Sequence, residues 1–435
     1  MEIFMKLNYK RTILVGFAFF LISAFWQAYD AIVPLILTNL FEMGQDMSGF
    51  IMSFDNILAV FMLPLFGGLS DKVSTKFGKR TPFIFCGTIA AVIFFISLGL
   101  ISDKALLPLF VVILLLTLIS MATFRSPAVA LMPDVTIKPL RSKGNAIINL
   151  MGTAGGILIL ALGIVFKTSE KGKTNFLAYI IAVCAVMLTG LVVFLLTVKE
   201  NKWVSEMEAD SEKFGLNNKE EEPVDNGPKR ALSKPELRSL LLILASVALW
   251  YIGYNAVTSK YSVYATEVLG FDYNLTLIVA QVAAIISYIP VGIIASKIGR
   301  KKSILIGITM LTTAFVLANL LVLAPSAAYT YPIFALAGIG WATINVNSFP
   351  MVVELAKGGD VGKYTGYYYT ASMSAQIVTP ILSGFLVERV FGWGVFFPYA
   401  AIFAAASFVT MFFVKHGDAK PESKGALESL AGEDD

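Results

Sequence analysis

Twelve apolar runs, each close to the length of a membrane-spanning helix, follow one another along this chain of 435 residues. The hydrocarbon core of a bilayer is about 30 Å thick, so a helix that crosses it needs roughly 20 apolar residues. Lipid offers no hydrogen bonds, and a helix satisfies its own backbone groups. The pattern therefore predicts an all-α membrane protein with twelve transmembrane helices. The predicted spans are residues 12–40, 48–69, 82–101, 106–132, 145–166, 175–198, 239–266, 275–295, 303–324, 329–353, 364–387 and 392–414.

The basic residues orient these spans, because Lys and Arg accumulate in cytoplasmic loops. With the amino terminus inside, 27 of the 34 Lys and Arg residues fall on the cytoplasmic side, five fall outside, and two lie within spans. We therefore expect a multi-pass protein of the cell (plasma or inner) membrane with both termini in the cytoplasm. The basic residues 1–11 run into an apolar stretch longer than the core of a signal peptide, so we expect a retained first helix.

Composition argues against a soluble enzyme. The chain is 57% hydrophobic and 15% charged, whereas an average soluble chain is about 25% charged. Both cysteines, Cys86 and Cys184, lie in apolar runs, and the single histidine, His416, follows the last span, so we expect neither a disulfide nor a metal site. The sequence also lacks a Gly-rich nucleotide loop and a soluble domain. We expect no catalytic residues and no cofactor apart from a coupling ion, H⁺ or Na⁺.

Charge and turn residues divide the chain into four parts. Residues 199–234 mix charges with Asn, Gly and Pro and lack an apolar period, which is typical of a solvated linker. The predicted parts are an N-terminal six-helix bundle (1–198), a cytoplasmic linker (199–238), a C-terminal six-helix bundle (239–415) and a cytoplasmic tail (416–435).

An internal repeat relates the two predicted bundles. Residues 67–80, which begin Gly-Gly-Leu-Ser-Asp-Lys and end Phe-Gly-Lys-Arg, recur in shorter form as residues 292–301, about 220 positions later. Asp134 precedes Lys143 by nine positions, and Glu354 precedes Lys363 by nine, again 220 apart. Parallel repeats of this kind predict two pseudo-equivalent bundles.

The repeated loop resembles the signature of the major facilitator superfamily, Gly-x-Leu-Ala-Asp-Arg-x-Gly-Arg-Lys. The first copy has four inserted residues, and in the second Ser296 replaces the acidic residue. Residues 70–84, with that insertion and a Pro-Phe-Ile ending, and residues 125–134 are similar to the sucrose/proton symporters and their glycoside-cation symporter relatives. The resemblance implies the major facilitator fold, with spans one, four, seven and ten lining a central cavity.

The loop motif suggests a charged latch at the cytoplasmic side. A carboxylate at a helix end can bind guanidinium and ammonium groups, and glycines permit close helix approach. We hypothesise that this network stabilises the outward-facing state; the alternative is that the lysines only signal topology. The candidate cytoplasmic gate residues are Gly68, Asp71, Lys72, Gly78, Lys79, Arg80, Asp134, Lys143, Arg300, Glu354 and Lys363.

Polar residues at membrane depth gather on the spans that the resemblance assigns to the cavity. Neutral amides and hydroxyls can bond sugar hydroxyls, and Trp rings offer flat apolar faces to a sugar ring. The alternatives are helix-to-helix bonding by the asparagines and plain packing by the tryptophans. The candidate substrate-binding residues are Trp26, Gln27, Tyr29, Tyr254, Asn255, Trp341, Asn345, Asn347 and Gln376.

Ionisable residues within spans are costly and usually functional. A carboxylic acid in hydrocarbon favours its neutral form, and a nearby Arg favours the charged form, so a movable pair can load and release a proton. We hypothesise that Asp30 or Asp55 carries the coupling proton and that Arg125 is the exchange partner. The plant symporters carry an acidic residue near the position of Leu118, so this chain departs from their pattern and sodium stays open.

The function favoured by these features is cation-coupled, most simply proton-coupled, symport of a sugar by alternating access, with a disaccharide such as sucrose or maltose as substrate. The alternatives are an efflux antiporter of drug-like or cationic compounds, a sodium-coupled glycoside symporter and a sugar sensor that does not transport. Expected partners are the sugar and the lipid bilayer. We expect a monomer that binds no nucleic acid.

Overall fold

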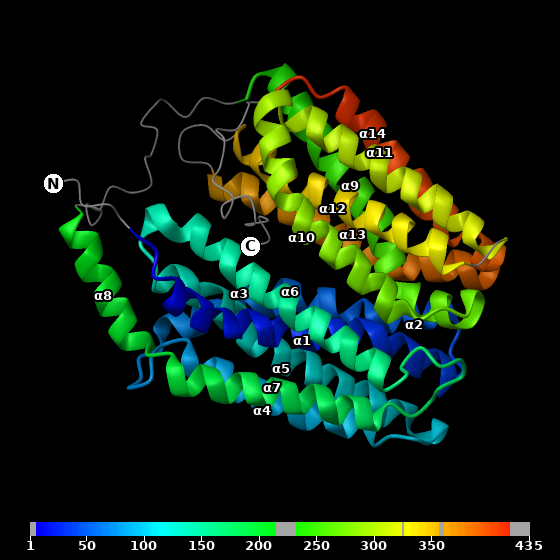
Figure 1. The fold of residues 1–435 in the computed structure, drawn as a ribbon, viewed down its shortest axis with the longest axis horizontal. Coiled ribbons are helices and arrows are strands. Elements are labelled where there is room, and N and C mark those ends of the chain that lie inside the picture. Colours follow the sequence, from blue (N-terminus) through cyan, green and yellow to red (C-terminus); the bar gives the residue numbers. More distant parts are fainter. Residues whose placement is uncertain (1–5, 215–231, 324–325, 356–360, 418–435) are drawn as a thin grey trace. The chain divides into compact units, whose positions relative to one another are not determined.

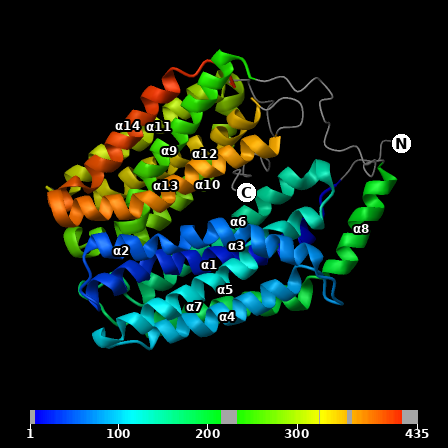
Figure 2. The ribbon, with the colours of Figure 1, turned by 180° about the vertical axis from the view of Figure 1, so that it is seen from behind.

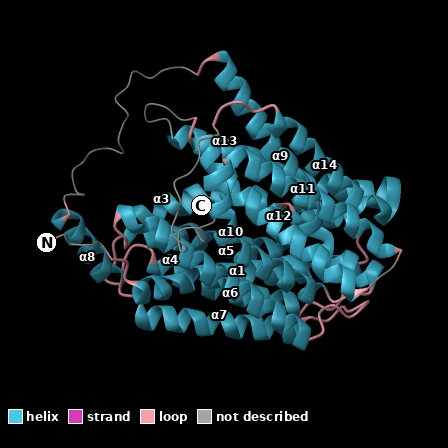
Figure 3. Ribbon diagram, turned by 45° about the horizontal axis from the view of Figure 1, so that its top comes forward, coloured by secondary structure: helices cyan, strands magenta, loops and turns pink. Residues whose placement is uncertain are grey.

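The computed structural model describes residues 6–214, 232–323, 326–355 and 361–417, and in these residues the regular structure is helical throughout (Figures 1 and 3). The described residues divide into two compact units. Residues 6–43 and 54–214 form the N-terminal unit, and residues 44–53 and 232–417 form the C-terminal unit.

The N-terminal unit is built around α1, which packs against α5, α6 and α7, while α4 packs against α5 and α7. Figure 2 shows α4, α5 and α7 side by side. Its helices are α1 (Tyr9–Asn39), α3 (Phe54–Lys72), α4 (Thr81–Gly99), the short η1 (Lys104–Leu106), α5 (Leu107–Asp134), the short η2 (Lys138–Leu140), α6 (Arg141–Val165), α7 (Leu177–Thr197) and α8 (Glu200–Lys213).

The C-terminal unit repeats this pattern of neighbours. Helix α12 packs against α10 and α11, and α9 packs against α13 and α14. Its helices are α2 (Gln45–Met52), α9 (Lys234–Val263), η3 (Tyr264–Leu269), α10 (Tyr273–Ile298), α11 (Arg300–Asn319), η4 (Leu320–Val322), α12 (Ala327–Val353), α13 (Val361–Phe385), η5 (Leu386–Phe391), η6 (Gly392–Val395) and α14 (Phe396–Phe412).

The spans agree with the apolar runs of the sequence. Eleven stretches of the described residues are long and apolar enough to cross a membrane, and the last of them, residues 363–412, contains two helices, α13 and α14. The predicted all-α membrane fold with twelve transmembrane helices is therefore confirmed. One span is interrupted, because α2 ends at Met52 and α3 begins at Phe54.

Polar helix starts explain where the boundaries differ from the prediction. Helix α9 begins at Lys234, five residues before the predicted apolar span, and the carboxylate of Glu236 accepts bonds from the Ser233 backbone N–H at 2.8 Å and hydroxyl at 2.7 Å. This capping arrangement begins the helix with polar residues that hydropathy does not register.

Two further features differ from the predicted parts. The segment expected to be a solvated linker begins with the ordered helix α8, while its residues 215–231 and tail residues 418–435 lie outside the described residues. Residues 44–53, placed by sequence in the N-terminal bundle, pack within the C-terminal unit instead. Both differences arise from long-range contacts that no local pattern encodes.

Candidate functional site

A charged group lies at membrane depth in the N-terminal unit. Helix α5 carries Arg125, whose guanidinium carbon lies 5.5 Å from the ring centre of Trp26 on α1. A cation over the face of a Trp ring is attracted by its electron-rich surface. Trp26 in turn meets Tyr29 edge to face, with ring centres 5.3 Å apart.

Two carboxylates complete this group. Asp30 on α1 and Asp55 on α3 interact electrostatically with each other and with Arg125. Asp55 Oδ1 accepts the Asn56 backbone N–H at 2.5 Å and the Asn56 side-chain amide at 2.7 Å, whereas the Asp30 side chain is exposed. The structure thus brings together the three residues that the sequence proposed for cation coupling, with Asp55 held by hydrogen bonds.

Position in the chain explains the difference between the two acids. Asp55 occupies the first turn of α3, where unpaired backbone N–H groups stabilise a negative charge. Asp30 lies nine residues from the end of α1, where the helix supplies no such donors. With two acids and one guanidinium, the group can hold one proton without leaving Arg125 uncompensated.

Tyr29 does not have the setting expected of a sugar ligand. It is fully buried, and its ring lies 5.9 Å from that of Phe25 in a stacked arrangement. Its hydroxyl is enclosed and has no hydrogen-bond partner among the described residues. Tyr29 is thus packed among neighbouring aromatics, and its role as a sugar contact stays a prediction; Gln27, on the same helix, is partly exposed.

An aromatic stack dominates the candidate residues of the C-terminal unit. The rings of Tyr254 on α9 and Trp341 on α12 lie 3.6 Å apart and within 6° of parallel, and Tyr251 meets Trp341 edge to face at 5.3 Å. One face of the Trp341 indole is therefore covered by protein. The two candidate residues Tyr254 and Trp341 therefore form a stacked pair, and their contact with a sugar stays a prediction.

The candidate asparagines of this unit bond mainly within their own helices. Asn255 donates its side-chain amide to the carbonyl of Tyr251 at 2.8 Å, and Asn347 donates to the carbonyl of Thr343 at 2.9 Å. Asn345 and Asn347 are 3% and 2% exposed. The bond of Asn347 to Thr343 stays within α12 and joins no second helix, and Gln376 on α13 is partly exposed.

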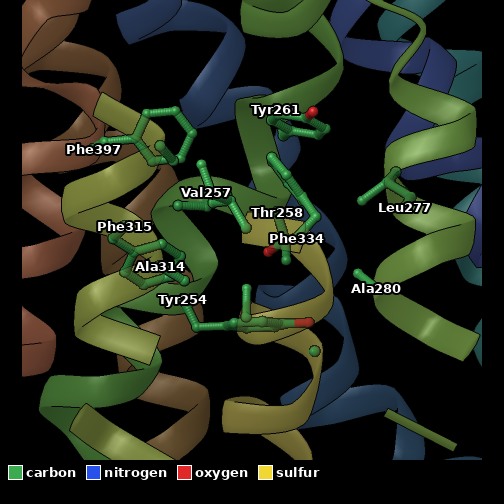
Figure 4. Close-up of a pocket in the computed structure, with 14 residues that line it drawn as sticks. Tyr254, Val257, Thr258, Tyr261, Leu277, Ala280, Ala314, Phe315, Phe334 and Phe397 are labelled. Atoms are coloured by element: carbon green, nitrogen blue, oxygen red, sulfur yellow. The ribbon is translucent and has the colours of Figure 1, made fainter. Parts of the chain in front are cut away.

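A small cavity of about 60 Å³ lies beside the stacked pair, among α9, α10, α11, α12 and α14. Figure 4 shows Tyr254 and Thr258 of α9 at its wall, facing the apolar side chains of Leu277 and Phe334. A water needs about 10–15 Å³ of such space, so the cavity is too small for a disaccharide.

The repeated loop forms an ion-pair network around Arg80. Its guanidinium contacts Asp134 at 2.8 Å and Asp71 at 2.5 Å and also bonds the Ser70 hydroxyl, while Lys79 contacts Asp134 at 3.2 Å. The Arg80 side chain is 5% exposed. These predicted gate residues do come together, and all of their contacts described here lie within the N-terminal unit.

The second copy of the repeat makes the corresponding pair. Arg300 contacts Glu354 at 3.0 Å, and the two residues are 54 positions apart, as are Arg80 and Asp134. The pseudo-symmetry inferred from the sequence therefore extends to an ion pair at the same place in both units.

Four predicted gate residues have other settings. Lys363 is exposed, with its ammonium 5.9 Å from the ring centre of Tyr367, and Lys72 is exposed. Lys143 is half-buried on α6. A Cβ on Gly68 would have no atom within 4 Å, and the part of Gly68 in the gate stays a prediction.

Glu200, at the start of α8, is a member of this network that sequence reasoning missed. Its carboxylate accepts the backbone N–H groups of residues 79–81 at 2.7 to 2.8 Å and the Thr81 hydroxyl at 2.7 Å. Gly78 has φ +120°, and a Cβ there would lie 2.1 Å from a Glu200 oxygen. Glu200 follows an apolar span by two residues, and nothing in that spacing distinguishes it from a linker residue.

Lys260 also has a setting that the sequence did not indicate. It is one of the two basic residues that fall within the predicted spans. It is 2% exposed, and its ammonium donates to the backbone carbonyl of Gln45 in α2 at 2.9 Å.

Comparison with known proteins identifies relatives by sequence and by fold. The family model described as Major Facilitator Superfamily matches residues 15–376 and 273–431. A Bacillus subtilis (strain 168) protein described as "Uncharacterized protein YqgE" is 29% identical over 210 residues, which cover 45% of this chain and 46% of that protein. The match thus spans about half the length of this relative.

Solved transporters share the fold at low sequence identity. The inward-open xylose transporter XylE from E. coli has a TM-score of 0.70 and 14% identity over 97% of this chain and 99% of its own. A peptide transporter POT has a TM-score of 0.68 and 14% identity over 93% of each chain. The nucleoside transporter NupG has a TM-score of 0.66 and 15% identity over 93% of this chain and 100% of its own.

Proposed function

Because this chain belongs to the Major Facilitator Superfamily, we propose that it is a proton-coupled symporter that moves a neutral sugar, most simply a disaccharide such as sucrose or maltose, across the cell membrane by alternating access. Membership of the family makes it a membrane transporter. The substrate and the coupling ion are the parts that we propose.

The observation that carries the proposal is the cluster of Asp30, Asp55 and Arg125 beside Trp26. Asp55 has local hydrogen-bond donors that suit a lasting negative charge, which would balance Arg125. Asp30 is exposed and interacts electrostatically with both Asp55 and Arg125. In the proposed cycle Asp30 takes up a proton with the sugar and releases it when the helices rearrange, and the attraction of Arg125 favours the charged form of Asp30 at that step.

Neutral polar side chains support a sugar over a charged substrate. In the N-terminal unit the remaining candidate contacts are Trp26 and Gln27, and in the C-terminal unit they are Gln376 and Trp341; all four are partly exposed. Amides can donate to and accept from sugar hydroxyls, and the indole ring offers an apolar surface to the sugar ring. An anion carrier would need more basic groups than Arg125 in this cluster.

The test is uptake of radiolabelled sucrose and maltose by proteoliposomes of the purified protein, with an inward proton gradient, an inward sodium gradient or neither. We expect accumulation of one sugar under the proton gradient alone. Accumulation under the sodium gradient alone would mean that the coupling ion is sodium and not the proton. An absence of both accumulation and counterflow for a panel of disaccharides would contradict the sugar proposal.

A further inference from the structure

Helix α2 is joined to the C-terminal unit by side chains that the proposed transport cycle does not use. It packs against α13 and η5, and Figure 2 shows α2 alongside α13. The crossing is close, since a Cβ on Gly49 would lie 1.9 Å from the carbonyl oxygen of Pro380, and a Cβ on Gly384 would lie 2.1 Å from that of Gln45. Glycines at both positions allow the two backbones to meet.

Four charged side chains hold this contact. Lys260 donates to the Gln45 carbonyl at 2.9 Å, and Glu388 accepts the Gln45 backbone N–H at 2.8 Å. Arg389 pairs with Asp46 at 2.8 Å, and Lys260 interacts electrostatically with both Asp46 and Glu388. The two positive and two negative charges balance, so the buried ammonium is compensated.

Lys260 is the central member of the cluster. Its side chain is 2% exposed, whereas Arg389 is 65% exposed. A buried charge–carbonyl bond is worth more than an exposed ion pair, which water and salt screen. The main contact that holds the first turn of α2 is therefore made by Lys260 of α9.

A break in the helix separates this contact from the coupling cluster. Ser53 lies between α2 and α3, and its hydroxyl bonds back to the carbonyl of Phe50 at 2.7 Å. Such back-bonding bends helices. Asp55 follows the break by two residues, so a change in the direction of α2 acts on the backbone next to that carboxylate.

We propose that α2 is a detachable gate segment at the end of the protein predicted to face outside, that Lys260 is the side chain that clamps it shut, and that Ser53 is its hinge. The clamp is a conformational device and does not depend on which sugar or ion is carried. Substitution of Lys260 frees α2 from α13 and replaces none of the residues Asp30, Asp55 and Arg125.

Accessibility of Ser48 reports the state of the gate, because this α2 residue is 1% exposed in the packed arrangement. The parent variant carries Cys86→Ser and Cys184→Ala, which remove both native thiols, and Ser48→Cys as the reporter. The measurement is the rate of labelling by a membrane-impermeant maleimide in intact cells. Lys104→Cys, a side chain 56% exposed, is the freely labelled control.

Adding Lys260→Met removes the ammonium and keeps an apolar stem of similar length. We expect labelling of the reporter to accelerate by about tenfold or more, which is the effect of losing one hydrogen bond to a charged group. The matched control Lys297→Met changes an exposed lysine on α10 and should leave the rate unchanged.

Gly384→Val provides a second way to open the gate without removing a charged residue, because its Cβ would lie 2.1 Å from the Gln45 carbonyl oxygen and 3.1 Å from the Lys260 ammonium. We expect the same acceleration as with Lys260→Met. Equal labelling rates in the parent and in whichever of the two variants reaches the membrane would overturn the clamp. If the two variants show the expected faster labelling but the protein takes up no sugar, the result contradicts the proposed function and leaves the clamp supported.

Discussion

Asp30 and Asp55 lie on different helices; Asp55 accepts two hydrogen bonds from Asn56, whereas Asp30 is exposed, and this difference decides what each is expected to do. We predict that Asp30→Asn abolishes accumulation of sugar against its gradient but preserves exchange of sugar across the membrane, because an amide cannot carry the proton. Counterflow and gradient-driven uptake in proteoliposomes measure the two activities.

The matched variant Asp55→Asn should have a different effect. It leaves Asp30 as the carboxylate facing Arg125, so protonation of Asp30 would leave the guanidinium without a counter-charge, which destabilises the protein. We expect lower thermal stability and a loss of both exchange and accumulation. If only Asp55→Asn preserved sugar exchange, Asp55 would be the proton carrier and Asp30 the counter-charge of Arg125.

Arg125 has a second contact that depends on its shape. Its planar guanidinium lies over the Trp26 ring at 5.5 Å, and the compact ammonium of a lysine does not reproduce this stacking. We predict that Arg125→Lys keeps the charge but lowers the transport rate at least about tenfold, as Trp26→Leu does, in line with a cation–π contact of about 2 kcal/mol when desolvated. Unchanged uptake in both variants would exclude a role for this contact.

At the scale of an element, α8 is attached to the membrane domain by Glu200. This carboxylate is 1% exposed and accepts four hydrogen bonds from residues 79–81. We predict that Glu200→Gln destabilises the protein by about 1–3 kcal/mol, because the amide leaves some of these donors unpaired. Thermal unfolding in detergent measures the effect.

The control for this prediction is Glu212→Gln, which changes an exposed residue on the same helix and should leave the melting temperature unchanged. Arg11 makes a separate attachment, since it bonds the carbonyl of Trp203 and that of Val135. An equal melting temperature for Glu200→Gln and Glu212→Gln would mean that α8 contributes little to the stability of the domain.

At the scale of the whole molecule, the internal repeat predicts equivalent ion pairs of unequal strength. Arg80 has three side-chain partners, Asp71, Ser70 and Asp134, and is 5% exposed, whereas Arg300 is 17% exposed and pairs with Glu354. We predict that Arg80→Gln costs about 3–5 kcal/mol, typical of breaking a buried pair, and Arg300→Gln about 1 kcal/mol or less. Chemical unfolding of both variants tests this order.

The sequence alone determined the features that depend on local composition and spacing. The bilayer sets the length of each apolar run, so the number of spans could be counted, and the repeated motif at an interval of 220 positions predicted the two related bundles. The sequence also indicated Asp30, Asp55 and Arg125 as candidates for cation coupling, because a charge within a hydrocarbon span is so costly that it needs a partner.

Only the tertiary structure decided which polar groups are already occupied by protein. No spacing indicates that Tyr254 stacks on Trp341, that Glu200 binds the loop at residues 79–81, or that Lys260 holds α2. These contacts join residues from about 90 to more than 200 positions apart. They arise because a buried donor or aromatic face must find whichever partner the packing of distant helices brings to it, and that packing is a property of the folded chain as a whole.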